Sequence, residues 1–238
     1  MDLKEEEILG DGIDAHWYYR AKLAALRRWT ADLRPAALLD VGAGSGHFSR
    51  KLLELTPAVT GTCVDPGYPA DREEQVAGKP LLFRREVAAT GADLVLLMDV
   101  LEHVDDDTGL LAAYVGKARS GACFVLTVPA FQWLWSGHDV FLEHRRRYTL
   151  PQLEGVARAA GLQVERAAYY FGAVLPLAAG LRLVGRLRGE DPRQARSQMQ
   201  RHGALVNGVL GALCAVELPL FPHNRLAGLS IFLRARKP

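Results

Sequence analysis

Three glycines at positions 42, 44 and 46 alternate with small residues in the segment LLDVGAGSGHFS, directly after an apolar run. Glycine has no Cβ atom, so such a bend can adopt positive φ angles and let a ligand lie against the backbone. Asp40 precedes the first glycine by two positions, and Asp65 follows a second apolar run. A carboxylate at that second place can accept hydrogen bonds from the hydroxyls of a ribose. The spacing therefore indicates a site for a ligand that contains a nucleoside.

The same bend is incomplete as a dinucleotide-binding motif. The fingerprint G-x-G-x-x-G requires glycine at position 47, where this chain has His47. In that fingerprint the third glycine allows the close packing of helix and strand beside a pyrophosphate. A nicotinamide-dependent oxidoreductase therefore stands as an alternative that position 47 disfavours and that tight binding of NADH would favour.

A sheet must hold the bend in place. Between positions 34 and 166, short apolar runs alternate with segments of helical periodicity. Most of the runs are unbroken by polar residues, which is typical of strands buried on both faces of a parallel sheet. The predicted strands are residues 36–41, 59–64, 80–84, 93–99, 122–129 and 162–168. Right-handed crossovers between them give an α/β, doubly wound and mostly parallel sheet.

The C-terminal third of the chain has a different pattern. Residues 174–188 and 193–216 are predicted helices, apolar but dotted with arginines, joined by a turn at 189–192. We expect them to form a lid over the site or a dimer face, with a surface resting on a membrane as the less favoured alternative. The last apolar run, 230–235, is predicted to add an antiparallel strand at the edge of the sheet.

The composition is that of a globular protein. Of 238 residues, 49% are hydrophobic and 24% are charged, and the net charge is only +2, so nucleic acid is not an expected partner. The apolar runs 167–181 and 203–221 are too short or too interrupted to span a membrane, and the acidic start MDLKEEEILG is unlike a signal peptide. Cys63, Cys123 and Cys214 fit no disulfide or metal spacing, so we expect buried thiols and a cytoplasmic location.

The run from Asp40 to Gly46, taken together with Asp65, resembles the class I S-adenosylmethionine-dependent methyltransferases. The resemblance extends to DVLEHV at 99–104, which is similar to the segment after the fourth strand in that family. It also reaches HWYYR at 16–20, which is similar to an N-terminal helix that covers the cofactor in many bacterial members. The resemblance implies a Rossmann-like fold with S-adenosylmethionine as the cofactor, and it is silent on the substrate.

The resemblance also implies roles for individual residues. The glycine bend would contact the methionine part of the cofactor, and Asp65 would accept hydrogen bonds from the ribose diol. Arg20 would pair with the methionine carboxylate, and the backbone near Met98 and Asp99 would meet the ammonium group. The residues implied for the cofactor are Tyr18, Arg20, Asp40, Gly42, Ala43, Gly44, Gly46, Asp65, Pro66, Met98, Asp99, Val100 and His103.

The methyl acceptor is expected beyond the fourth and fifth strands, beside the segment PAFQWLWSGHDVFLEHRRRYTLPQL. A sulfonium is already a strong electrophile, so most of the catalytic task is holding acceptor and methyl group in line. A histidine suits the removal of a proton from a hydroxyl acceptor. This segment resembles a branch of bacterial methyltransferases in which a histidine and arginines precede a Tyr-Thr helix start. The candidate catalytic residues are His144, His138 and Asp139, and the candidates for binding the acceptor are Phe131, Trp133, Trp135, Arg147 and Tyr148.

Each assignment has a structural alternative. Asp40 and Asp65 can tie down their own turns, and the aromatic residues at 16–20 can simply pack on the core. His144 can lock its loop through a carbonyl, and the arginines at 145–147 can form a solvated face. The acids at 105–107 are interpreted as a solvated helix start, and no metal site is expected.

The function predicted from these features is methyl transfer to a small molecule, most favourably to a hydroxyl oxygen. The alternatives are a nitrogen acceptor on a small molecule or on a lipid or glycan intermediate, the oxidoreductase, and a non-catalytic cofactor-binding module. An acidic or lipid-linked acceptor and a homodimer are further options. One domain is expected over residues 1–238, with cofactor-covering helices at 1–34, the Rossmann-like core at 35–173, the lid or dimer insertion at 174–228 and a final strand at 229–238.

Overall fold

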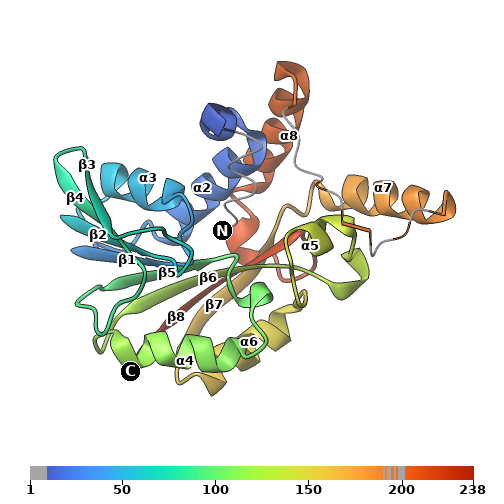
Figure 1. Cartoon of the computed structure of the whole chain (residues 1–238). Helices are drawn as coiled ribbons and strands as arrows, with labels where there is room; N and C mark the ends of the chain where they lie inside the picture. The colour runs from blue at the N-terminus through green and yellow to red at the C-terminus, as the bar shows by residue number, and fades with distance from the viewer. Residues whose placement is uncertain (1–9, 190, 192–193, 196, 198–201) are drawn as a thin grey trace.

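One mixed sheet runs through the part of the chain that the computed structural model describes, residues 10–189, 191, 194–195, 197 and 202–238 (Figure 1). Its strand order is β3-β4-β2-β1-β5-β6-β8-β7. The neighbours from β4 to β6 are parallel, whereas β3 and β8 pair antiparallel with their neighbours. The strands are β1 Ala37–Val41, β2 Thr60–Val64, β3 Arg72–Val76, β4 Lys79–Arg84, β5 Leu94–Met98, β6 Cys123–Pro129, β7 Gln163–Tyr170 and β8 Ser230–Arg236.

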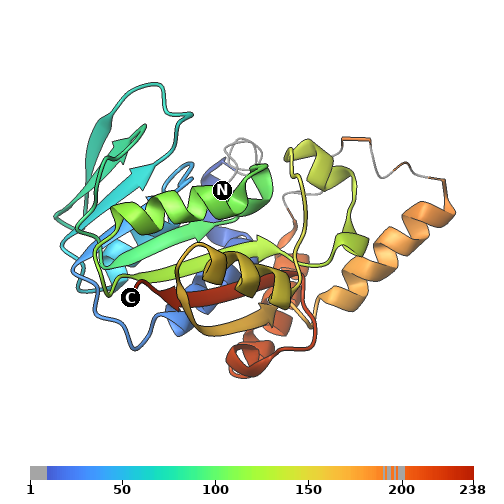
Figure 2. The same ribbon diagram turned by 90° about the horizontal axis from the view of Figure 1, so that it is seen from below.

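Helices cover both faces of this sheet. Figures 1 and 2 show α2, α3 and α8 on one face and α4 and α6 on the other, with α7 projecting from the body of the molecule. The α-helices are α2 Trp17–Trp29, α3 His47–Leu55, α4 Asp107–Lys117, α5 Gly137–Phe141, α6 Leu150–Ala159, α7 Leu175–Leu187 and α8 Ala204–Glu217. Short 3-10 helices are η1 Gly10–Ala15, η2 Leu101–His103, η3 Gln132–Leu134 and η4 Phe221–His223. No described helix is both long and apolar enough to cross a lipid bilayer.

The order of the strands fixes where a ligand can bind. Successive strands extend to one side from β1 through β2 and to the other side from β5 through β6, so the order reverses between β1 and β5. In an open parallel sheet, ligands bind outside the carboxyl ends of the strands at such a reversal. The glycine bend that follows β1 lies at this point, as the sequence predicts.

The sequence predicts the strands well and the edges of the sheet poorly. The six central predictions match β1, β2, β4, β5, β6 and β7 to within two residues at each end. The expected edge position of the last strand is wrong, because β8 lies between β6 and β7. Ile231, Phe232 and Leu233 of β8 are all fully buried, which fits an interior strand.

A strand that the sequence did not reveal, β3, pairs only with β4. Its sequence REEQV is almost entirely polar, because an edge strand with little cover does not need apolar side chains. The turn between β3 and β4 is formed by Ala77 and Gly78, which both adopt positive φ, 52° and 77°. Positive φ at both positions is typical of a two-residue β-hairpin turn.

The C-terminal helices are confirmed in part. The predicted helix 174–188 corresponds to α7, while the second described helix, α8, begins at Ala204 rather than at position 193. The described positions between them, 194–195 and 197, are not helical, and residues 190, 192–193, 196 and 198–201 lie outside the described part. Cys63, Cys123 and Cys214 are free and buried, as expected.

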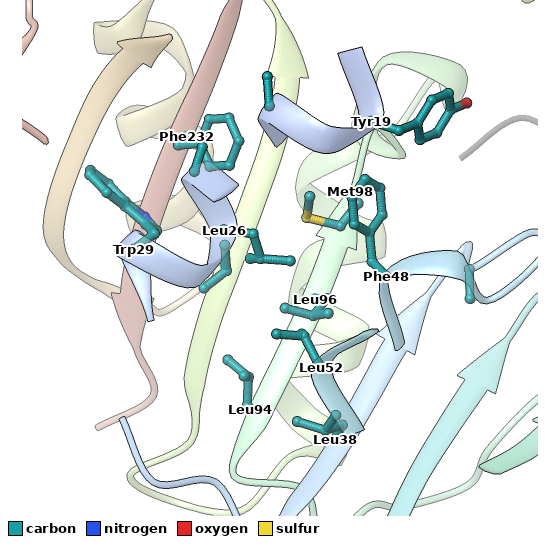
Figure 3. Close-up of a cluster of buried hydrophobic side chains, with 14 of the residues drawn as sticks. Tyr19, Leu26, Trp29, Leu38, Phe48, Leu52, Leu94, Leu96, Met98 and Phe232 are labelled. Carbon is teal, nitrogen blue, oxygen red and sulfur yellow. The ribbon is translucent and has the colours of Figure 1, made fainter. Parts of the chain in front are cut away.

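The larger core lies between α2, α3 and the sheet (Figure 3). Leu26 and Trp29 of α2 and Leu52 of α3 are fully buried against Leu94 and Leu96 of β5 and their neighbours. Each such side chain contributes roughly 1.5–3 kcal/mol by leaving water. This packing fixes α2 over the sheet, and therefore fixes the polar residues at its N-terminal end.

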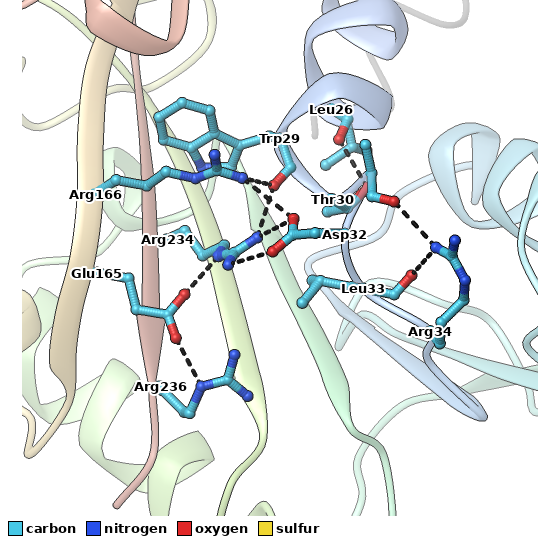
Figure 4. Close-up of polar contacts among 11 residues, drawn as sticks. Leu26, Trp29, Thr30, Asp32, Leu33, Arg34, Glu165, Arg166, Arg234 and Arg236 are labelled. Carbon is cyan, nitrogen blue, oxygen red and sulfur yellow. Dashed lines mark hydrogen bonds and ion pairs between the residues drawn. The ribbon is translucent and has the colours of Figure 1, made fainter.

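A polar clasp holds the other end of α2 (Figure 4). Asp32, just after the helix, accepts hydrogen bonds from both terminal nitrogens of Arg234 in β8, at 2.6 and 2.8 Å. Arg234 also donates from Nε to Glu165 of β7 at 2.5 Å and from Nη1 to the Trp29 carbonyl at 3.2 Å. The Arg166 guanidinium lies 4.4 Å from the centre of the Trp29 ring. Both ends of α2 are thus tied to the sheet.

Candidate active site

The bend after β1 requires its glycines. Gly42, Gly44 and Gly46 have φ angles of 64°, 54° and 80°, a region that side chains with a Cβ rarely adopt. At Gly42 a Cβ would also lie 2.7 Å from Cγ2 of Val100, which is closer than real Cβ atoms approach. The amide groups of Gly42 and Ala43 donate to the Val64 carbonyl at 2.7 and 3.3 Å. The bend is therefore a rigid cradle between β1 and β2.

Asp40 lies beneath this bend and is buried in β1. Its Oδ2 accepts a hydrogen bond from Ser49 of α3 at 2.7 Å, whereas its Oδ1 is buried with no hydrogen-bond partner among the described residues. Burial raises the pKa of Asp40 to about 6. Asp40 therefore connects α3 to β1, the two elements that the glycine bend joins.

Asp65 lies beside the bend at the carboxyl end of β2. Its Oδ2 accepts from the amide of Gly44 at 3.1 Å and its Oδ1 from the amide of Gly67 at 2.9 Å. A carboxylate oxygen can accept more than one hydrogen bond, so these contacts leave capacity for a diol. Pro66 forms the turn with it, and the Tyr68 hydroxyl, from the same turn, donates to the Gly44 carbonyl at 2.6 Å. Both proposed roles of Asp65, shaping the turn and accepting from a ribose, fit this position.

A buried ion pair closes the opposite side. Asp99 follows Met98 at the end of β5 with a φ of 55°, and its Oδ1 accepts from the Thr127 hydroxyl at 2.9 Å. Its Oδ2 pairs with the Lys22 ammonium and lies 3.4 Å from the Tyr18 hydroxyl. Burial alone would raise the pKa of Asp99, but the Lys22 ammonium lowers it, so the carboxylate stays ionised.

The sequence did not reveal the contact of Lys22 with Asp99. Lys22 is 1% exposed, whereas Arg20, which stays a predicted partner of the methionine carboxylate, is exposed on α2; neither residue is in the lining of the cavity described below. A signal was present in the sequence: Lys22 lies four residues after Tyr18 and interrupts the buried face that continues to Leu26. A lysine on the buried face of an amphipathic helix needs an acidic partner.

The segment after β6 brings together Asp139, His144 and Arg147. Asp139 is fully buried and forms a capping box with Ser136 at the start of α5. Arg147 donates from Nε to Oδ1 of Asp139 at 2.7 Å and from Nη2 to Oδ2 at 3.0 Å. His144 Nδ1 lies 2.9 Å from Oδ1. Burial opposes ionisation, but the bonds from His144 and Arg147 hold the pKa of Asp139 well below its usual range.

The three arginines at 145–147 are not one solvated face. Arg145 is exposed and lies 3.6 Å from Asp105, while Arg146 lies 3.3 Å from Asp107. Arg147 is buried with its guanidinium committed to Asp139 and to the Ala130 carbonyl. Its expected role in binding the acceptor would therefore compete with these contacts.

A cavity of about 750 Å³ is lined by part of each group of predicted residues, while the glycine bend and Asp65 are not in its lining. Tyr18, Asp99 and His103 line it from the cofactor group, and Trp135, His138, His144 and Arg147 line it from the loop after β6. α7 and α8 close it with apolar side chains and with Arg182 and Arg186. The described C-terminal helices are thus walls of the same cavity.

Three predicted acceptor residues lie away from this cavity. Phe131 stacks on Tyr169 with ring centres 5.0 Å apart, and Trp133 is 53% exposed. The Tyr148 hydroxyl lies 2.7 Å from Oδ2 of Asp107 and 3.1 Å from the Leu101 carbonyl oxygen. Burial raises the pKa of Tyr148, and the hydrogen bond to Asp107 raises it further. In this structure these side chains shape the loop.

Glu102 lies in the segment DVLEHV and was given no catalytic or binding role from the sequence. It is completely buried, and neither carboxylate oxygen has a hydrogen-bond partner among the described residues. Burial, and then the charge of Asp99, raise its pKa well above the usual value. Its neighbour His103 packs edge-on against His144 with ring centres 4.8 Å apart, and burial lowers the pKa of His103 to about 4. Glu102 is the one described acid that lines the cavity with no partner of its own.

The residues around the bend fit a sulfonium nucleoside. Asp65 and Asp99 are acids on either side of the glycines, suited to a ribose diol and to a positively charged ligand. The glycine cradle offers backbone rather than side chains, and Tyr18 of α2 lies 3.4 Å from Asp99. Among the described residues, Lys22 is committed to Asp99, and Arg50 donates to the Ser45 carbonyl and to Glu74.

Comparisons with known proteins agree with this chemistry. A family model described as a methyltransferase domain matches residues 14–167, while no curated protein matches the chain. The [4+2]-cyclase SpnF shares the fold with a TM-score of 0.55 at 15% identity, over 93% of this chain and 82% of its own. Phosphoethanolamine N-methyltransferase 2 of Haemonchus contortus, solved with S-adenosyl-L-methionine, gives 0.54 at 16%, over 96% and 57%. The pyocyanin biosynthetic protein PhzM gives 0.52 at 14%, over 92% and 55%.

The solved structures establish the fold, and the family model, which covers most of the chain, establishes the family. The strand order and the acids around the glycine bend are in keeping with both. The chain belongs to the class I S-adenosylmethionine-dependent methyltransferases.

Proposed function

We propose that this enzyme methylates a hydroxyl oxygen of a small molecule bound in the cavity between the loop after β6 and helices α7 and α8. The observation that carries the proposal is the pair of Asp139 and His144, with Nδ1 of the imidazole 2.9 Å from the carboxylate and the ring lining the cavity. A histidine oriented in this way is suited to a proton-bearing acceptor.

The contact with Asp139 sets which ring nitrogen of His144 carries the proton. Asp139 is ionised, so His144 donates from Nδ1 and its Nε2 is left to accept a proton from the acceptor. General base catalysis of this kind contributes roughly 10²–10⁴-fold. Asp139 is the positioning residue, since it is fully buried and held by Arg147 and Ser136. His138 also lines the cavity and is the second candidate base.

S-adenosylmethionine, when bound, supplies an electrophilic methyl group. The chain's own contribution is to hold it: Gly42 and Gly44 give room against the backbone, and Asp65 accepts from the ribose. Asp99 follows β5, the neighbour of β1, and lines the cavity together with Tyr18, so a methyl group held at the cradle would be close to the acceptor side. Excluding water and fixing the line of attack are the main further tasks.

The cavity wall supports an amphipathic, acid-bearing acceptor. Leu177, Leu181 and Val184 of α7 give an apolar wall. Arg182 lines the same wall, and burial lowers its pKa to about 10, so it remains a cation at neutral pH. A guanidinium there is suited to a carboxylate or phosphate on the acceptor. A lipid-linked acid has both properties.

The position of α7 and α8 supports the lid assignment over a dimer face, because both helices line the cavity. Exposed apolar side chains on their outer sides, including Leu187 and Leu205 at 80% each, leave a homodimer through these helices as the second reading. The buried free thiols fit a cytoplasmic location.

The test is label transfer from methyl-labelled S-adenosylmethionine to a panel of hydroxylated amphipathic acids and their amine counterparts. We expect label as O-methyl product with the wild type, and roughly 10²–10⁴-fold less with His144→Ala. Binding of S-adenosylhomocysteine by this variant should be unchanged. Label only in the amine products would establish the nitrogen alternative. Unchanged turnover by His144→Ala would remove the proposed base.

A further inference from the structure

Three side chains that could ligate a metal meet at the cavity. Glu102 and His103 come from η2 after β5, and His144 comes from the loop after β6. One ligand atom from each lies within 4.8 Å of the corresponding atoms of the other two. Two imidazoles and a carboxylate are a common ligand set for first-row transition metals.

The environment of Glu102 independently indicates a site for a positively charged ligand. Its side chain is fully buried, and both carboxylate oxygens lack a hydrogen-bond partner among the described residues. An isolated buried carboxylate is costly, and native proteins normally pair it or bind it to a metal. Lys22, a described cation whose charge acts on Glu102, is already bound to Asp99.

The two histidines are held as metal-binding histidines usually are. A ligating imidazole generally donates its other ring N–H to a carboxylate or a backbone carbonyl. His144 meets Asp139 through Nδ1 at 2.9 Å, and the ring of His103 donates to the Leu142 backbone carbonyl. Each ring therefore has one nitrogen left, and the near-perpendicular rings lie 4.8 Å apart beside Glu102.

We propose that Glu102, His103 and His144 bind one divalent first-row transition metal ion. All three residues line the cavity, so an ion held by them would lie beside the acceptor and could keep coordination positions open to it. An ion with open positions can bind and polarise an acceptor oxygen. Nitrogen ligands favour Zn²⁺, Co²⁺ or Fe²⁺ over Mg²⁺, which prefers oxygen.

The role of the ion rests on the proposed methylation of a hydroxyl, whereas ion binding itself does not. Polarisation makes the acceptor hydroxyl acidic, and its proton leaves to water. The oxygen then forms its bond to the methyl carbon as the carbon–sulfur bond breaks, and the sulfonium becomes a neutral thioether. With the ion bound, Nε2 of His144 is a metal ligand in place of the general base proposed above, and Asp139 positions the ring through Nδ1 as before.

The experiment is titration of metal-stripped protein with Zn²⁺ by calorimetry and with Co²⁺ by visible absorption. We expect one equivalent bound per chain, with binding weakened roughly 100-fold or more by Glu102→Gln. This variant keeps the size of the side chain and removes a buried unpaired acid, so it should fold at least as well as the wild type. Asp139→Asn should weaken binding roughly 10–100-fold.

His223→Ala is the matched control, because His223 is exposed in η4 and lies outside the cluster. It should bind both ions as the wild type does. Absence of a saturable site, or Glu102→Gln binding as tightly as the wild type, would overturn the proposal. If O-methylation proceeds unchanged after metal removal, the ion's role fails and the proposed function stands. If the ion binds but no hydroxyl is methylated, the metal site stands, and the proposed function fails together with the ion's role in it.

Discussion

The acidic side chains at the site have different hydrogen-bond and charge partners, and these partners set whether each carboxylate is ionised. Asp139 has a guanidinium and an imidazole, and Asp99 has the Lys22 ammonium. Asp40 has only the Ser49 hydroxyl, and Glu102 has no described partner. The first two are held ionised, while the pKa values of the last two are raised. Charge at this site is therefore distributed by local partners.

Lys22→Met tests the ion pair beneath the cavity. Removing Lys22 leaves the Asp99 carboxylate, whose side chain is 20% exposed, without its cation, which costs roughly 1.5–3 kcal/mol as a lost charge-assisted hydrogen bond, less than in a fully buried pair. We expect a loss of that order in the free energy of unfolding, measured by urea denaturation. The double variant Lys22→Met/Asp99→Asn should recover much of it, since asparagine tolerates the positive φ of position 99. No recovery would show that Lys22 acts through packing.

Asp40→Asn tests the buried acid of β1 through pH. The folded pKa of about 6 lies above the ordinary value of 3.8, so folding favours the protonated form. The contribution of Asp40 is therefore fully present below about pH 4 and is lost as pH rises through 6, on the order of 3 kcal/mol. The difference in unfolding free energy between wild type and variant should change over this interval. A difference constant from pH 4 to 7 would contradict it.

At the scale of residues, the sequence showed which residue types could do chemistry more reliably than it showed which side chains contact one another. Asp65, Asp99, His144 and Asp139 could be proposed for the site because these acids and this histidine follow predicted strands. Lys22 and the unpaired state of Glu102 depend on contacts between segments far apart in the chain, such as α2 with β5. Spacing alone does not encode those contacts.

At the scale of elements, the bend between β1 and α3 is the most constrained feature. Gly42→Ala places a Cβ 2.7 Å from Val100 and imposes a positive φ on alanine. We expect a loss of roughly 1–3 kcal/mol in stability and weaker binding of S-adenosylhomocysteine, measured by denaturation and calorimetry.

Gly155→Ala is the control for this substitution. Gly155 lies within α6, and a Cβ there meets no atom within 4 Å. Alanine should stabilise that helix by roughly 0.5–1 kcal/mol and leave nucleoside binding unchanged. If both variants lose affinity equally, the bend has no special requirement for glycine.

The elements that the sequence predicted well are those whose own residues form a recognisable pattern along the chain. Buried parallel strands such as β5, LVLLM, are continuous apolar runs. The polar edge strand β3 lacks that signal, and the interior place of β8 depends on pairing with β6 and β7. Strand order is a property of the whole sheet.

At the scale of the whole molecule, the clasp between Asp32 and Arg234 joins the N-terminal helix to the last strand (Figure 4). The bond from Arg234 lowers the pKa of Asp32 to about 2, from 3.8. Its contribution to stability is therefore present above about pH 4 and is lost as pH falls towards 2. Because the Asp32 side chain is 60% exposed, we expect Asp32→Asn to cost less than about 1 kcal/mol at pH 7 and nothing at pH 2, by urea denaturation. An equal effect at both values would contradict the ion pair.

The whole-molecule arrangement explains why the position of the glycine bend was predictable and the acceptor cavity was less so. The bend, the proposed cofactor site, lies at the reversal of strand order, which alternating strands and helices predict. The acceptor cavity is closed by α7 and α8, whose placement no local pattern specifies. Phe131, Trp133 and Tyr148 looked suited to an acceptor by type, yet their described contacts are with the protein.

The most direct test of the central claim is calorimetric titration of S-adenosylhomocysteine into the wild type, Asp65→Ala and His144→Ala. The wild type should bind one equivalent, and Asp65→Ala should lose roughly tenfold or more in affinity, because each charge-assisted hydrogen bond contributes about 1.5–3 kcal/mol. His144→Ala should bind as the wild type does, since it faces the acceptor. Equal binding by Asp65→Ala and the wild type would contradict the account of how the glycine bend and its neighbouring acid hold the nucleoside.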